Sequence, residues 1–376
     1  MLVIAGCIMF NKYIMASPEL LSAAPTTELS TPPRLTVVID EKRTEEVLGK
    51  LLKLYNNNEY PYNLENTRVP HHPDHMPKEM PRGGKEHASF LWSVCYYMRG
   101  GIKSVEAVKR MAHMYDDPDN RYLFDFEQAQ YATHADVDSA LKAHGLGLRD
   151  AVSRQWIANA KRMVEQYNGD PRTIFDGITH YDEALERIRN DHKGNGFMGF
   201  QHKMTSMIIY YLIDDNLIDG FDDFPIPIDL HVMRMSIANE MITFPDASED
   251  QKLFAPETTE ALRQLYTDYA HTHKVSPIAL SNAVWLYSEA LCGYQPGNIT
   301  LEPDGRGKRN GRQTNLVPLE YNPLDDAQRK AYERTCGRCA LRGTCAWNIP
   351  GKPYYVLGEL RRRGKRPDYP IDPTLF

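Results

Sequence analysis

Apolar residues recur at helical spacing along most of the chain. In the segment 40–55, positions 47, 48, 51, 52 and 55 are apolar, and this spacing places them on one face of a helix. The same period continues almost without interruption from residue 86, and glycines stand where several of these helices are expected to end. No segment alternates apolar and polar residues over the length of a convincing strand. The pattern therefore predicts an all-α fold with short connections and no internal repeat.

Composition divides this helical chain into segments. The first 39 residues are rich in Pro, Ser and Thr after position 15 and are predicted to be a disordered lead-in. No basic residue precedes the apolar residues at the start, which favours a loose tail or an upstream start over a secretion signal. The predicted segments are the lead-in 1–39, an N-terminal helix and surface segment 40–85, a core 86–240, C-terminal helices 241–350 with an insert 293–335, and a basic tail 351–376.

One long connection interrupts the helical pattern. Residues 56–84 are rich in Asn, Pro and His and show no periodicity, so we expect a surface segment there. The segment contains a cluster of imidazole and carboxylate groups, namely His71, His72, Asp74 and His75. Such a cluster could bind a metal. Because the segment is rich in proline, we expect a solvated loop instead.

The overall composition is typical of soluble globular proteins. The chain of 376 residues carries 44 Lys and Arg against 50 Asp and Glu, a net charge of −6. This balance excludes a histone-like polycation, although basic patches on an acidic protein can still bind nucleic acid. No apolar run is long enough for a transmembrane helix. A chain of this length builds a core without disulfides, and we expect a monomer in the cytoplasm or at the nucleoid.

A glycine-rich turn at residues 194–199 joins two predicted helices. Such a turn can direct backbone N–H groups at a phosphate, and the second helix adds the positive end of its dipole. Glycines such as Gly196 and Gly199 would let a nucleic-acid backbone come close. Alone this signal is weak, because many helical hairpins turn on glycine.

Asp229 follows two prolines, Pro225 and Pro227, and opens the next predicted helix. At a helix start, the dipole and the N–H groups of the first turn keep a carboxylate ionised. A carboxylate held there can stabilise the oxocarbenium ion that develops when a glycosidic bond breaks. Lys203, at the head of the preceding helix, could attack the sugar carbon as an amine. Alternatively, Asp229 is only an N-cap and Lys203 only a solvated helix residue.

Three of the six cysteines cluster near the end of the chain. Cys336, Cys339 and Cys345 form the pattern C-x2-C-x5-C. Such clustering in a long chain favours a metal site over disulfides, and therefore a reducing compartment. Thiolates at this spacing suit an iron–sulfur cluster, and they also suit zinc.

Together these motifs resemble the helix-hairpin-helix DNA glycosylase superfamily, in particular its endonuclease III-like iron–sulfur branch. The family's glycine hairpin ends in a lysine, as 199–203 does here, and its Val-Asp-x-His-x-x-Arg stretch is similar to 228–234. Residues 141–167 resemble the helix pair that precedes the hairpin. The resemblance covers residues 86–350. It implies a six-helix barrel core within 86–240, a helix-hairpin-helix motif at 182–214 and an iron–sulfur cluster domain.

The resemblance also implies roles for particular residues. Asp229 would be the catalytic aspartate, and Lys203 lies where bifunctional members carry the lysine that forms a Schiff base. The hairpin would contact DNA through Gly196, Gly199, Gln201 and His202. A [4Fe–4S] cluster, with zinc as the alternative, would be held by Cys292, Cys336, Cys339 and Cys345, leaving out Cys7 and Cys95.

The chain departs from the family's pattern at several points. Cys292 and Cys336 are separated by 43 residues, far more than in the family. Gln201 replaces the second glycine of the family's Gly-x-Gly, and the loop 98–104 lacks the glutamine with which the family wedges DNA. The long insert is expected either to contact phosphates or to be a flexible loop, and its basic residues are Arg306, Lys308, Arg309 and Arg312.

The resemblance leads us to expect a DNA glycosylase, with or without AP lyase activity, that removes a damaged or modified base. The alternative keeps the fold and changes the chemistry. It is an enzyme of thymine hypermodification that replaces the pyrophosphate of 5-(hydroxymethyl)uracil diphosphate in DNA by an amine or amino acid, of the α-glutamyl/putrescinyl thymine pyrophosphorylase type. The departures fit such a diverged member. An inert DNA-binding module is disfavoured, because both Asp229 and Lys203 are present.

Overall fold

The computed structural model describes the chain from residue 36 to residue 345, with gaps. The chain divides into two compact units, 1–34 and 35–376, and every described residue belongs to the second. The lead-in up to residue 35, the basic tail and Cys7 lie outside the described residues. Those described are 36–98, 102–147, 151–189, 196–221, 223–245, 256–292, 326, 330 and 333–345, together with the backbone of the strand residues 299–303, 308–309, 312–313 and 316–321.

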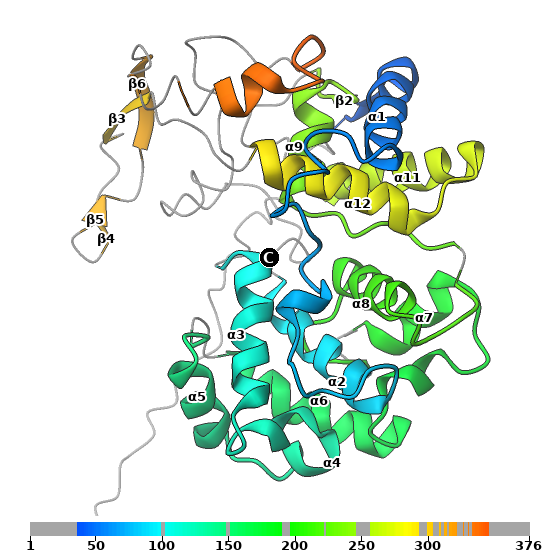
Figure 1. Cartoon of the computed structure of the whole chain (residues 1–376), viewed down its shortest axis with the longest axis vertical. Helices are drawn as coiled ribbons and strands as arrows, with labels where there is room; N and C mark the ends of the chain where they lie inside the picture. Colours follow the sequence, from blue (N-terminus) through cyan, green and yellow to red (C-terminus); the bar gives the residue numbers. More distant parts are fainter. Residues whose placement is uncertain are drawn as a thin grey trace, which may run out of the picture. The chain divides into compact units, whose positions relative to one another are not determined.

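Helices between residues 85 and 214 share one hydrophobic core, as the periodicity predicts (Figure 1). Large aromatic side chains fill this core, among them the fully buried Trp92, Phe124 and Trp156. The indole N–H of Trp156 donates to the Leu123 carbonyl at 2.8 Å, so its one polar atom is satisfied inside the core. The helices are α2 (Lys85–Val94), α3 (Ser104–Asp116), α4 (Phe126–Ala129), α5 (His134–Ala143), α6 (Ala151–Tyr167), α7 (Tyr181–Ile188) and α8 (His202–Asp214), with the 3-10 turns η2 (Cys95–Tyr97), η3 (Arg121–Phe124) and η4 (Pro171–Phe175).

A second hydrophobic core combines segments from both ends of the described chain. α1 packs against α12, and α9 packs against α11, α12 and the π-helical turn η5. β1 (Val38–Ile39) pairs with β2 (Ile242–Thr243) in a short antiparallel ladder. α9 lies within the segment 86–240, yet its buried residues belong to this second core. The helices are α1 (Glu41–Asn56), α9 (Leu230–Ala238), α11 (Pro256–His273), α12 (Pro277–Tyr287) and η5 (Ser288–Cys292). No described helix is long and apolar enough to cross a membrane.

The connection 56–84 lies at the surface over much of its length, as its composition predicts, but part of it is buried. It contains the 3-10 turn η1 (Pro73–His75), and His71 is only 2% exposed, which contradicts the prediction of a solvated loop there. The His71 ring places Nε2 2.6 Å from Asp214 Oδ2 at the end of α8. This partner satisfies a buried polar group, so the connection can cover the helical core.

The insert contains short strands, although the sequence shows no alternating segment of convincing length there. β3 (Ile299–Pro303) pairs antiparallel with β6 (Leu316–Tyr321), and the register shifts between Thr300 and Leu301. Between them, β4 (Lys308–Arg309) pairs with β5 (Arg312–Gln313), which sets Arg309 opposite Arg312. Arg306 lies outside the described residues. The remaining basic positions of the insert therefore belong to a short β-hairpin.

Candidate active site

The glycine turn between α7 and α8 is described from Gly196 onward. Phe197 donates its N–H to the Ile188 carbonyl at 2.9 Å, and a parallel bridge pairs Phe197 with Arg189. Gly196 has a φ of +71°, and a Cβ there would overlap the Arg189 carbonyl. The sequence predicts a glycine for close approach of a ligand, but at Gly196 the close neighbour is the protein's own backbone. Gly199 also has a positive φ, +86°, which favours glycine.

A side chain from α6 holds this turn in place. The buried Asn159 accepts the N–H of Met198 at 2.7 Å and donates to the Met198 carbonyl at 3.0 Å, as a neighbouring strand would. The amide of Asn159 also donates to the Tyr96 hydroxyl at 3.2 Å. Arg162, one turn further along α6, donates to the carbonyl of Gly196. The backbone of the turn is therefore fixed by α6.

Lys203 occupies the first turn of α8 and is buried, with 7% of the residue exposed. Its ammonium donates to the Met98 carbonyl at 2.7 Å. Met98 directly precedes residues 99–101, which lie outside the described residues. The alternative that Lys203 is a solvated helix residue is therefore wrong. The N-cap Gln201 makes no capping hydrogen bond with its side chain, and the His202 ring lies near the Tyr181 hydroxyl, with Nδ1 at 3.4 Å.

Asp229 is the N-cap of α9, as the paired prolines predict. Its Oδ1 accepts the backbone N–H groups of His231 at 2.9 Å and Val232 at 3.0 Å. Its Oδ2 accepts the indole N–H of Trp285 from α12 at 3.1 Å. A carboxylate offers about four acceptor positions, so three donors orient the group and leave capacity for a substrate. Capping a helix and serving a reaction are therefore compatible at Asp229.

The ring of His231 lies among the charges of this site. Its Nδ1 is 3.2 Å from Ser288 Oγ, its Nε2 is 3.5 Å from Glu289 Oε2, and its ring centroid is 5.4 Å from that of Trp285. Burial lowers the pKa of His231. The carboxylates of Asp229 and Glu289 raise it, while Arg234 and Lys203 lower it further. Asp229 from α9 and Lys203 from α8 therefore act on one imidazole.

Three of these residues carry no role in the sequence analysis. Trp285, Ser288 and Glu289 lie in the helical stretch that precedes Cys292. Their only sequence signal is their place before that cysteine, because the contacts with α9 join residues more than fifty positions apart. Glu289 also lies 3.6 Å from the ammonium of Lys103, at the start of α3. The carboxylate of Glu289 is therefore shared by Lys103 and His231.

The four cysteines predicted as ligands come from η5 and from the turn η6 (Cys336–Arg338) with the residues after it. Burial raises the pKa of the Cys292 thiol well above its usual value, and the thiols of Cys339, Cys345 and Cys336 each raise it further. The charged forms of Cys336, Cys339 and Cys345 therefore all act on the Cys292 sulfur. No described residues form a group of three or more His, Cys, Asp or Glu side chains that could hold a metal ion as they stand. Cys95 is buried in the first core.

The residues after Cys336 contact α12, α1 and the connection that follows α1. The Tyr287 hydroxyl lies 3.3 Å from Cys339 Sγ and accepts the N–H of Ala340 at 2.8 Å. Lys50 of α1 donates to the carbonyl of the same Ala340 at 2.6 Å. The Arg338 guanidinium stacks 4.3 Å from the centroid of the Tyr60 ring. These contacts fix Cys339 beside α12.

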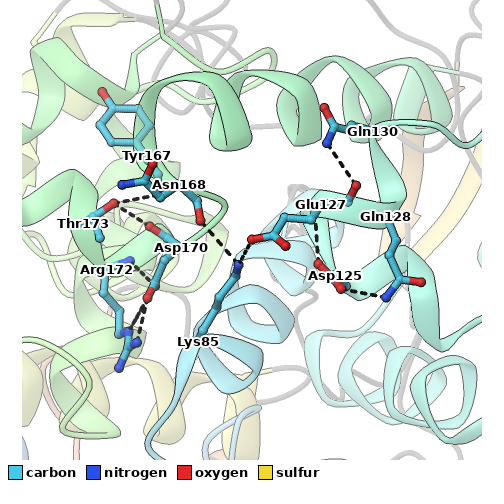
Figure 2. A network of polar contacts seen from close by, with 10 residues as sticks. All are labelled: Lys85, Asp125, Glu127, Gln128, Gln130, Tyr167, Asn168, Asp170, Arg172 and Thr173. Atoms are coloured by element: carbon cyan, nitrogen blue, oxygen red, sulfur yellow. Dashed lines mark hydrogen bonds and ion pairs between the residues drawn. The ribbon is translucent and has the colours of Figure 1, made fainter.

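A pocket of about 500 Å³ lies elsewhere, between α2, η3 and α4. Several of its charges are paired within the protein, since Lys85 contacts Glu127 at 2.6 Å and the Asn168 carbonyl at 3.4 Å (Figure 2). No predicted site residue lines this pocket, whose lining is Lys85, Glu86, Ser89, Pro118, Arg121, Tyr122, Phe124, Asp125, Glu127 and Gln128.

Comparison of the chain with family models, curated proteins and solved structures finds no match. The arrangement around Asp229 is therefore the basis for assigning a function.

Proposed function

We propose that this protein is a DNA glycosylase with the helix-hairpin-helix glycosylase fold. The observation that carries the proposal is the position of the Asp229 carboxylate. Three N–H groups fix it, and its charge and that of the buried Lys203 ammonium act on the same histidine. A fixed anion and a fixed cation whose charges act on one imidazole suit a reaction in which positive charge develops on a sugar carbon.

The chemistry follows from these two groups. As the glycosidic bond of a nucleotide breaks, C1′ gains positive charge, and the Asp229 carboxylate stabilises it without having to reorient. The amine of Lys203 can then bond to C1′, which makes the enzyme bifunctional and permits later strand cleavage. Hydrogen bonding to Met98 keeps that nitrogen in a defined place. The base is flipped out of the duplex before this step.

The DNA backbone is held by the turn and the start of α8. Gln201 leaves the first turn of α8 without a side-chain cap, and the positive end of a helix dipole attracts a phosphate. Gly199, Gln201 and His202 are partly exposed and belong to this surface, whereas Gly196 is buried against the Arg189 backbone. Basic residues of the insert add phosphate contacts that neutralise charge, namely Arg306, Lys308, Arg309 and Arg312.

A [4Fe–4S] cluster is the metal group that this proposal implies, with zinc as the alternative. The chemistry of the donor set suits the group, because four thiolates are the usual ligands of such a cluster, although no three of the described side chains are grouped to hold a metal as they stand. The cluster would hold the loop after η5 in shape and take no part in breaking the glycosidic bond. Its ligands would be Cys292, Cys336, Cys339 and Cys345.

One observation favours the second candidate, the thymine-modifying transferase. The Lys203 ammonium is buried and donates to a backbone carbonyl, so it can serve as a fixed cation for a leaving pyrophosphate instead of as a nucleophile. Such an enzyme would leave the glycosidic bond intact and join an amine or amino acid to the methylene carbon of the base.

A panel of oligonucleotide duplexes tests both candidates. Each duplex carries one damaged base or one 5-substituted pyrimidine, and the set includes 5-(hydroxymethyl)uracil diphosphate. The products are identified by mass spectrometry. The glycosylase releases a free base and leaves an abasic site or a nicked strand. The transferase releases pyrophosphate and leaves a strand whose base carries the added amine. Wild-type protein that changes none of the duplexes would contradict both.

A further inference from the structure

The exposed edge of the site is formed by a histidine and a glutamate, and neither is the proposed catalytic aspartate or lysine. The side chain of His231 is 21% exposed and that of Glu289 is 30% exposed. The backbone N–H of His231 binds Asp229, and its ring lies against Trp285, which also donates to Asp229. His231 is therefore placed by the same contacts that orient the carboxylate.

The two nitrogens of the His231 ring have different neighbours. Nδ1 is at hydrogen-bond distance, 3.2 Å, from Ser288 Oγ, which lies in the buried part of η5. Nε2 is 3.5 Å from Glu289 Oε2, longer than a normal hydrogen bond to a carboxylate. The Nε2 edge is therefore loosely held and can take up a proton beside Glu289.

We infer that His231 is the proton acceptor of this site and that Glu289 sets its proton affinity. This inference rests on the proposed glycosylase function, and it adds a third catalytic residue to Asp229 and Lys203. Glu289 is a positioning residue, because it acts through His231.

The proton can be followed through one turnover. The ammonium of Lys203 gives a proton to His231 and becomes an amine. As the bond between C1′ and the base breaks, the base departs with the electron pair, and the amine forms its bond to C1′. The protonated His231 returns its proton to a nitrogen of the departing base. The sum is a protonated Schiff-base precursor on Lys203 and a neutral free base, so charge and atoms balance.

The surrounding charges suit this exchange. Burial keeps His231 neutral at neutral pH, so it can accept a proton there. The charged groups that act on the ring are Asp229 and Arg234 of α9, Glu289 of η5 and Lys203 of α8. Lys103 acts on it indirectly, because its ammonium lies 3.6 Å from the other oxygen of Glu289. Once the ring is protonated, its charge disfavours a second ammonium on Lys203.

Two variants of exposed residues test the inference, because they should shift the titration midpoint of His231 in opposite directions. Glu289→Gln removes a negative charge near the ring and should lower the titration midpoint of His231. Lys103→Gln leaves Glu289 to act on the ring alone and should raise that midpoint. For partly exposed charges, each shift should be roughly half a pH unit. NMR of labelled histidine measures the midpoint in the protein without substrate.

The same variants should move the acidic limb of the base-release rate against pH in the same two directions. His231→Gln should remove that limb and slow single-turnover base release roughly a hundredfold. The matched control is His273→Gln, since His273 also neighbours a carboxylate, Glu45 at 2.7 Å, and this variant should keep the wild-type profile.

The outcomes separate the inference from the proposed function. Midpoints that shift oppositely, with an acidic limb that follows them, support the inference. Midpoints that do not move oppositely, or an acidic limb that persists in His231→Gln, overturn it even if bases are released. A wild-type protein that releases no base from any duplex overturns the glycosylase itself, whatever the NMR titration shows.

Discussion

Replacing Asn159 by alanine should loosen the turn between α7 and α8 more than any surface change. The substitution deletes three hydrogen bonds, two to the Met198 backbone and one to the Tyr96 hydroxyl. Each such bond contributes about 1 kcal/mol net to stability. The buried groups left without their partner add a further cost, so we expect about 3 kcal/mol or more off the free energy of unfolding.

Urea denaturation, monitored by circular dichroism, measures this loss of stability. DNA affinity at low salt shows whether the turn between α7 and α8 keeps its conformation. The matched control is Asn57→Ala, because Asn57 is exposed and its side-chain amide donates to the exposed Glu59. That control should change stability by less than about 0.5 kcal/mol. If Asn159→Ala loses under about 1 kcal/mol and binds DNA as the wild type does, Asn159 does not hold the turn.

Three further predictions follow from the site. If the enzyme is bifunctional, borohydride should trap a covalent adduct with substrate DNA, and Lys203→Gln should abolish both the adduct and strand nicking; an adduct in that variant would exclude the lysine. Protein purified without oxygen should be brown with about four iron atoms per chain, whereas a colourless protein with one zinc would contradict the cluster. The lowered pKa of His231 means that the unfolded state binds more protons below pH 6.5, its ordinary value, so stability should fall as pH drops through that region. His231→Gln should reduce this loss of stability between pH 7.5 and pH 5.5, measured by urea denaturation. A variant whose free energy of unfolding falls as much as that of the wild type between these pH values would refute the prediction.

Periodicity predicted the helices well because their buried faces follow from local spacing. It missed the burial of His71 in the connection 56–84, because that burial depends on Asp214, 143 positions away. It also missed the strands of the insert. β6 contains Pro318, paired with Leu301, and proline within an apolar run argues against a strand. A pattern read within short windows cannot register partners supplied by distant segments.

The candidate site divides in the same way. Asp229 was predictable because the prolines and the cap lie within a few residues of it. The third donor to the Asp229 carboxylate is Trp285 of α12, 56 positions later in the chain. Glu289 lies in η5, directly after that helix. Lys203 was predicted by position, yet its burial against Met98 depends on η2, more than one hundred positions earlier. The motif therefore singles out particular residues as candidates, and the structure adds what orients their side chains.

The rate of base release by Asp229→Asn tests the central claim most directly. Asparagine is as good an N-cap as aspartate, so this variant keeps the helix start. It removes the charge and puts an amide NH2 in place of Oδ2, which accepts the indole N–H of Trp285. On the duplex that the wild type processes fastest, we predict a single-turnover rate roughly a thousandfold lower, since each 1.36 kcal/mol lost from the transition state costs tenfold. DNA affinity should stay within about threefold of the wild type. A variant that releases the base within about tenfold of the wild-type rate would show that Asp229 only caps α9.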